Sequence, residues 1–165
     1  MVAEALAPAL APADTPAAAE QDAAREIYLT CVLQGIGYLL PGGAVREVEA
    51  LGALTPVPHT LPWLRGVMNL RGAVVPVVDL ARFLGFTREA SAGRVALVCA
   101  DGDDALALAV DAVSAIRRVA AAEILPLPEH VASRTRYLGG LYRTPAGLLG
   151  VLDLPRLLQE LELHS

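Results

Sequence analysis

The chain has 165 residues, a formal net charge of −5, 55% hydrophobic residues and only 4% aromatic residues. Its basic residues are scattered, with Arg117-Arg118 as the only doublet, which argues against a nucleic-acid partner. Each apolar run is interrupted before the roughly 18 residues that a membrane-spanning helix needs. The first residues include Glu4 and three prolines in place of a basic region, so we expect no secretory signal and a cytoplasmic location.

The residues that usually carry catalysis or bind metals are isolated from one another in the sequence. Cys31 and Cys99 each lie in an apolar stretch without a second cysteine or a histidine at ligand spacing, which is typical of buried free thiols. His59, His130 and His164 stand far apart. No serine lies in a G-x-S-x-G motif, and no phosphate-binding loop is present. The sequence therefore predicts no catalytic residue, no metal site, no cofactor and no enzyme.

Residues 1–25 are rich in alanine, proline and acidic residues. Such a composition buries too little apolar surface to offset the conformational entropy that is lost on ordering, so we predict a disordered tail. A short peripheral helix over residues 16–25 is the alternative, because alanine and glutamate favour helix after a proline start. Residues 26–165 are predicted to form the folded domain.

From residue 27 onward, short β-prone segments alternate with Gly, Pro or Asp, a spacing typical of all-β barrels and sandwiches. Aliphatic residues dominate these segments, and the β-branched ones among them favour strands. Asp101-Gly102 separates two of the segments with residues that accept positive φ, which is a strong hairpin signal. The predicted strands cover residues 27–33, 36–40, 44–50, 67–70, 74–78, 94–100, 105–110, 113–119, 137–142 and 148–152.

Two short helices are predicted directly after strands. Asp79 can cap a helix over residues 80–84, and Asp153 can cap one over residues 154–161 with Pro155 at an early helical position. Pro76 lies inside the strand before the first helix and removes one backbone donor. We therefore expect this strand at a sheet edge or with a bulge.

The sequence contains the same unit twice. Gly66 and Asp79 are thirteen residues apart, as are Gly140 and Asp153, and each Asp is followed by Leu, a variable residue, Arg and two apolar residues. Both units predict a hairpin followed by a capped helix. Chance similarity is the alternative, because a turn between apolar segments before Asp-Leu is a common pattern.

Three apolar positions recur upstream at the same spacing, namely Leu40, Val45 and Val48 in the first half and Leu108, Val113 and Ile116 in the second. Each half, about 27–90 and 91–161, therefore has about five short strands and a closing helix, and strands can be exchanged between the halves. Five short strands remove their open edges by curling into a small barrel. The sequence thus predicts a mainly β fold of two small five-stranded barrels packed together, with an apolar seam between them.

Residues 45–85 contain four short motifs: V-R-E-V at 45–48, T-P-V-P at 55–58, G-V-M-N-L-R-G at 66–72 and V-P-V-V-D-L at 75–80. These motifs, in this order, resemble those of CheW-like domains, and the likeness extends over residues 27–161. The resemblance implies two intertwined five-stranded barrels of the SH3-like type. It also implies binding to the regulatory domain of a CheA-type histidine kinase and to the cytoplasmic tip of a chemoreceptor.

The family pattern, transferred residue by residue, places partner-binding positions at Val45, Glu47 and Val48. A regular strand would direct Val45 and Glu47 to one face, with an apolar contact next to a hydrogen-bond acceptor. Packing in the core is the alternative for the two valines, and a solvated strand position is the alternative for Glu47.

Arg71 and Asn69 are the other partner-binding residues that the resemblance implies. Arg71 lies at the expected tip of a hairpin, where a rigid guanidinium suits carboxylates or carbonyls of a partner; a solvated turn residue is the alternative. We expect Asn69 to bond the backbone of this turn. Gly66 and Gly72 are expected to supply permissive backbone, and Asp79 to act as a helix cap more than as a site.

Together these features predict a non-enzymatic adaptor that couples a chemoreceptor to a CheA-type kinase, without nucleic acid and without insertion into a membrane. Two alternatives stay open. The chain can serve a pilus, twitching or other non-flagellar chemosensory pathway. It can also be a stand-alone peptide-binding barrel that modulates kinase assembly.

Overall fold

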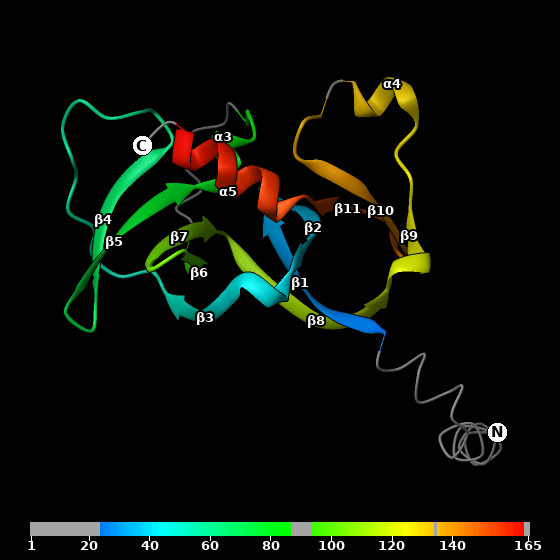
Figure 1. Ribbon diagram of the computed structural model, residues 1–165, viewed down its shortest axis with the longest axis horizontal. Helices are drawn as coiled ribbons and strands as arrows, with labels where there is room; N and C mark the ends of the chain where they lie inside the picture. Colours follow the sequence, from blue (N-terminus) through cyan, green and yellow to red (C-terminus); the bar gives the residue numbers. More distant parts are fainter. Residues whose placement is uncertain (1–23, 87–93, 134, 164–165) are drawn as a thin grey trace, which may run out of the picture.

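The computed structural model describes residues 24–86, 94–133 and 135–163, which form two β-sheets with short helices (Figure 1). One sheet comprises β1 (Arg25–Leu33), β2 (Ile36–Pro41), β8 (Ala112–Ala120), β9 (Ile124–Leu125), β10 (Leu138–Thr144) and β11 (Gly147–Leu152). The other comprises β3 (Val45–Ala50), β4 (Leu64–Leu70), β5 (Ala73–Asp79), β6 (Val95–Asp101) and β7 (Asp104–Val110). The helices are η1 (Gly42–Ala44), α3 (Leu80–Phe83), η2 (Ala121–Glu123), α4 (Glu129–Ala132) and α5 (Leu154–Leu163).

The strand orders are β8-β1-β2-β11-β10-β9 in the six-stranded sheet and β3-β6-β7-β5-β4 in the five-stranded sheet. The mainly β fold and the ten predicted strands are confirmed, and the two sheets fit two SH3-like barrels. One strand of the six-stranded sheet, β9, was not predicted, because a strand of two residues shows no periodicity in the sequence. The predicted tail lies outside the described residues up to residue 23, and its last residue, Arg25, already belongs to β1.

The sequence repeat is visible in space. The first unit runs from β1 to α3 and the second from β6 to α5, and each ends in a hairpin and a helix. Each unit gives its first two strands to the sheet of the other: β1 and β2 pair with β8 and β11, while β6 and β7 pair with β3 and β5. Both sheets therefore combine strands from either side of residue 90, itself outside the described residues, and the two barrels are intertwined.

The sequence suggested that Pro76 lies in an edge strand or at a bulge. Its strand, β5, is instead an interior strand of the sheet. β5 lies between β7 and β4 in the sheet. The parallel pairing of β5 with β7 starts only at Val77, so it does not include Pro76. The bulge lies in the partner strand β4, between Leu64 and Gly66. An interior strand thus accommodates the proline because its missing donor is not needed in the ladder to β7.

Three apolar clusters hold the fold together. One lies within the five-stranded sheet around Met68 and Val77, and one lies within the six-stranded sheet around Tyr28 and Leu39. The largest combines residues from both sheets and from α5, including Leu29 and Leu97. This third cluster is the apolar seam between the barrels, and its burial joins them into one unit.

Helix α5 covers the seam (Figure 1). Leu154, Leu157 and Leu161 are buried and belong to the seam cluster, at the i, i+3 and i+7 spacing that places side chains on one helix face. Asp153 starts the helix by accepting a hydrogen bond from the backbone N–H of Arg156 at 3.2 Å. The second repeat thus closes the interface between both barrels with its own terminal helix.

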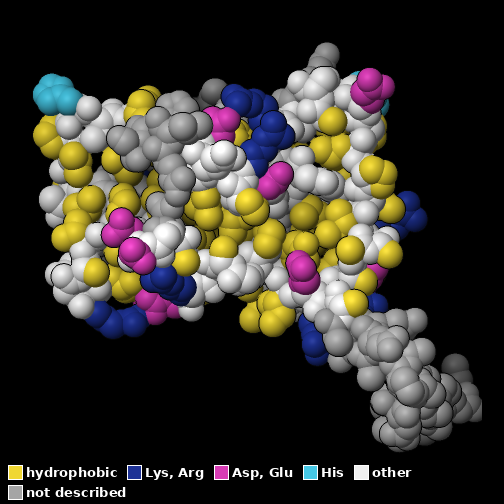
Figure 2. All heavy atoms as spheres, viewed as in Figure 1, with side chains coloured by type: hydrophobic (Ala, Val, Ile, Leu, Met, Phe, Trp, Pro, Cys, Tyr) yellow, Lys and Arg dark blue, Asp and Glu magenta, His cyan; other side chains and the backbone are white. Residues whose placement is uncertain are grey.

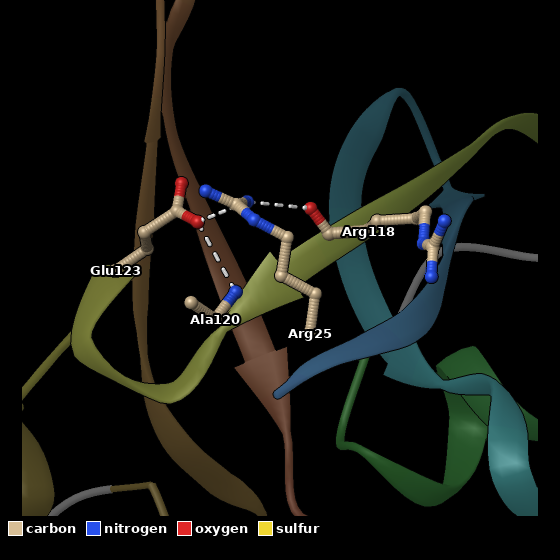
Figure 3. A network of polar contacts seen from close by, with 4 residues as sticks. All are labelled: Arg25, Arg118, Ala120 and Glu123. Atoms are coloured by element: carbon tan, nitrogen blue, oxygen red, sulfur yellow. Dashed lines mark hydrogen bonds and ion pairs between the residues drawn. The ribbon is translucent and has the colours of Figure 1, made fainter. Parts of the chain in front are cut away.

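A polar network fixes the start of β1 (Figure 3). The guanidinium of Arg25 donates to the Glu123 carboxylate at 2.5 Å and to the Arg118 carbonyl oxygen at 3.2 Å. The same Glu123 oxygen accepts a hydrogen bond from the backbone N–H of Ala120 at 3.1 Å. The strand is therefore anchored to β8 and η2 at the point where residues 1–23 join it.

Candidate functional site

The hairpin of β4 and β5 ends in a two-residue turn that displays Arg71. Leu70 pairs with Ala73, and Arg71 and Gly72 between them have φ values of +50° and +88°. Two positive φ values give the turn a twist that matches the right-handed twist of the strands it joins. The side-chain oxygen of Asn69 accepts a hydrogen bond from the Gly72 N–H at 2.8 Å. This bond braces the turn, and 65% of the Arg71 side chain is exposed.

Arg71 forms ion pairs with two carboxylates on β3. Its Nη2 contacts Glu47 Oε2 closely and lies 3.4 Å from Glu49 Oε1. The two acids are two residues apart on one strand, so their side chains share a face. A guanidinium has five N–H donors, and the described ion pairs engage only Nη2. The carboxylates therefore orient the group while donors remain for a partner.

Val45 and Glu47 do not share a face, contrary to the expectation from a regular strand. Val45 pairs with Cys99 and Glu47 with Val98, because a bulge at position 46 interrupts the register. Val98 and Cys99 are consecutive and point to opposite faces. Val45 instead packs against the seam cluster, while Val48 is 47% exposed. Of these predicted partner-binding residues, Val45 is half-buried against the core.

Gly66 and Asp79 position the hairpin. A Cβ added at Gly66 would lie 2.4 Å from the carbonyl oxygen of Thr55, and Thr55 bridges to Val67 on the open side of β4. Asp79 accepts a hydrogen bond from the N–H of Arg82 at 3.2 Å and caps α3. Both residues thus fix the backbone of the hairpin. In the turn itself, a Cβ added at Gly72 would have no atom within 4 Å.

Sequence reasoning missed Val74. Its side chain is 72% exposed, and it pairs across the hairpin with Asn69, which is also exposed. A valine two residues after the tight turn, at the exposed start of a strand that becomes buried at Val75, is the signal that could have revealed it. We call Asn69, Arg71 and Val74, with Glu47 holding the arginine, the hairpin surface.

The hairpin surface presents a guanidinium, an amide, a valine side chain and the carboxylate that holds the guanidinium. In residues 24–86, 94–133 and 135–163, no three His, Cys, Asp or Glu side chains gather as metal ligands. Burial raises the pKa of the Cys31 and Cys99 thiols to about 12, so both stay protonated and poorly nucleophilic near neutral pH. Across the same described residues, none of the helices has the length and apolarity that crossing a bilayer requires.

A family model for the CheW-like domain matches residues 28–162. The chain belongs to the CheW-like domain family. This match includes the hairpin surface and both barrels, so the family pattern read at residues 45–85 extends across the described fold.

Relatives and a solved structure agree with this membership. Chemotaxis protein CheW of Rhizobium meliloti is 40% identical over 87 residues, which cover 52% of this chain and only 56% of that relative. Probable chemotaxis protein CheW of Rhizobium etli is 34% identical over 121 residues, or 72% of this chain and 78% of the relative. The crystal structure of scaffolding protein TtCheW from Thermoanaerobacter tengcongensis has a TM-score of 0.69 and 24% identity, covering 79% of this chain and 85% of that chain. That structure has the same CheW-like fold.

Proposed function

We propose that this CheW-like protein is a non-enzymatic adaptor that couples a chemoreceptor to a CheA-type histidine kinase in the cytoplasm. The observation that carries the proposal is the hairpin surface: an exposed arginine held by two carboxylates next to an exposed valine, within a CheW-like domain. Relatives that carry the name chemotaxis protein support the pathway. The proposed partners are the kinase regulatory domain and the cytoplasmic tip of the receptor.

The hairpin surface has the composition of a protein-binding site. Arginine is among the residues that contribute most to binding energy at interfaces. A fixed ion pair on the free protein reduces the side-chain entropy that binding would otherwise cost. Val74 adds apolar surface, from which water is excluded when a complex forms. We assign partner contacts to Glu47, Asn69, Arg71 and Val74, with Val48 as a further exposed position on the other face of β3.

Two barrels give an adaptor two separate surfaces. The hairpin surface belongs to the five-stranded sheet, while the equivalent hairpin of the second repeat, β10 and β11, exposes Leu148 at the matching position after its turn. Because the apolar seam joins the barrels into one unit, partners bound to different barrels would be held in a fixed relation. This rigidity is what coupling a receptor to a kinase requires.

A binding experiment with the purified full-length chain tests the proposal. Isothermal titration calorimetry measures binding to a CheA-type regulatory domain, to a receptor-tip fragment, and to each in the presence of the other. We expect binding to both and a ternary complex. Binding to the kinase alone would support instead a barrel protein that modulates kinase assembly, and binding to neither partner would refute the adaptor proposal.

A further inference from the structure

An apolar groove lies beside the start of β1, between η1 and α5. Its volume is about 600 Å³, and Ile27, which is 53% exposed, forms part of its wall. The other lining residues are Glu26, Pro41, Gly42, Gly43, Ala44, Leu154, Pro155 and Leu158. Figure 2 shows hydrophobic side chains gathered in the middle of this face of the molecule. A groove of this size and character can hold a short apolar segment.

The sequence before β1 has a pattern that suits such a groove. Alanine occupies every odd position from 3 to 13, while the even positions include Leu6, Pro8, Leu10 and Pro12. In an extended backbone a period of two places these four side chains on one face. Pro8 and Pro12 disfavour helix, and a proline favours extended conformations of the residue before it, which lowers the entropy that docking in an extended form would cost.

We propose that residues 6–12 dock in this groove of the same chain, with the face formed by Leu6, Pro8, Leu10 and Pro12 against Ile27 and Leu158. Twelve residues lie between Pro12 and Arg25 and span up to about 40 Å when extended. A connection of this length keeps the segment at an effective concentration on the order of millimolar. Weak apolar contacts are sufficient for docking at that concentration.

Charge favours the same occupant. Residues 1–23 contain four acidic residues, Glu4, Asp14, Glu20 and Asp22, and no lysine or arginine. Three exposed arginines are neighbours of lining residues: Arg118 pairs across the strands with Ile27, Arg156 follows Pro155 in the sequence, and Arg46 lies two residues after Ala44. Glu26 adds one acid to the lining. The three arginines outnumber Glu26, so the positive charge around the groove attracts the acidic segment.

The docking does not depend on the identity of the partners. It can therefore hold even when the adaptor proposal fails, and the experiment below contains no partner.

Paramagnetic relaxation enhancement in the full-length chain tests the docking. Ala9→Cys introduces a thiol on the alanine face of the segment for attachment of a nitroxide, while buried Cys31 and Cys99, with pKa values raised to about 12 by burial, stay unlabelled. We expect the amide signals of Ile27, Ala44 and Leu158 to lose most of their intensity. The signals of Val74 and Leu148, at the two hairpins, should keep theirs and serve as internal references.

Two matched pairs of substitutions separate docking from simple proximity. Leu6→Asp with Leu10→Asp places two charges on the docking face, and Ala7→Asp with Ala11→Asp places the same charges on the other face. We expect the first pair to abolish the signal loss and the second pair to preserve it. Equal behaviour of the two pairs, or no signal loss without substitutions, would overturn the proposal. Signal loss in a mixture of nitroxide-labelled chain and separate isotope-labelled chain would assign the groove to a second copy and would also overturn it.

Discussion

Arg71 and Glu47 join the two ends of the five-stranded sheet. Glu47 lies on β3, Arg71 lies at the end of β4, and these strands are first and last in the sheet order. Their ion pair is possible only because the sheet curls into a barrel, and the Thr55–Val67 bridge pairs the segment after β3 with β4. Exposed ion pairs contribute at most about 1 kcal/mol to stability. The pair therefore serves mainly to fix the position of the guanidinium.

Arg71→Ala is expected to weaken binding of the kinase or the receptor tip by roughly 1 to 3 kcal/mol. The free energy of unfolding should change by less than about 1 kcal/mol, because the arginine is largely exposed. Titration calorimetry measures the first quantity and urea unfolding the second. Arg136→Ala is the matched control, since the Arg136 side chain is 63% exposed and also forms an ion pair with a carboxylate, that of Glu160, but lies outside both hairpins. Unchanged affinity in a folded Arg71→Ala variant would remove Arg71 from the interface.

Glu47→Gln tests whether the carboxylate orients Arg71. The substitution keeps the side-chain shape and removes the charge, so Arg71 loses its strongest described contact. We expect a loss of partner affinity of about 0.5 to 1 kcal/mol, smaller than that of Arg71→Ala, with non-additive effects in the double variant. Calorimetry on the unsubstituted chain, the two single variants and the double variant gives the coupling energy between Glu47 and Arg71. Fully additive losses would show that Glu47 contacts the partner independently.

Gly66→Ala and Gly140→Ala are expected to destabilise the fold strongly. A Cβ would lie 2.4 Å from the Thr55 carbonyl oxygen in the first case, and 2.8 Å from the Leu125 carbonyl oxygen and 2.5 Å from a methyl of Ile124 in the second. Backbone must move at both positions, and Gly66 also has φ of +144°, so we expect losses of about 3 kcal/mol or more. Gly72→Ala meets no atom and should cost only about 1 to 2 kcal/mol for its left-handed φ. Urea unfolding of the three variants gives the order, and equal losses would contradict it.

Local patterns in the sequence were sufficient for the strands and for the repeat. Gly66 and Asp79 recur as Gly140 and Asp153 because each hairpin needs a close backbone approach at the glycine and a cap at the aspartate. The exchange of strands between repeats depends on long-range pairing, so no local pattern specifies it. The same holds for β9, whose two residues are strand only because they pair with Leu141 and Tyr142.

The candidate site was predictable where a turn dictates it and not where a bulge intervenes. Asn69 and Arg71 follow from the sequence of a tight turn, and both lie at the exposed end of the hairpin. The bulge at position 46 reverses the expected relation of Val45 to Glu47. It reflects how β3 fits against β6, which the residues of β3 alone do not reveal.

Alkaline pH is expected to destabilise the fold through its two cysteines. Burial raises the pKa of Cys31 and of Cys99 from 9.0 to about 12 in the folded chain. Between these values the unfolded chain releases thiol protons that the folded chain retains, so the free energy of unfolding falls as pH rises through this window. Below pH 9 the contribution is fully present. Urea unfolding at about pH 8 and about pH 10 measures the loss.

The Cys31→Ala, Cys99→Ala double variant isolates the thiols from other groups. The thirteen Lys and Arg residues are all arginines, so no lysine titrates between the two pH values. Burial also raises the pKa of Tyr28 and Tyr38, and their effect has the same sign and persists in the variant. We expect the variant to be less stable at neutral pH, because the substitutions leave cavities, but to lose less stability between the two pH values. An equal loss in both proteins would mean that the buried thiols do not govern the alkaline response.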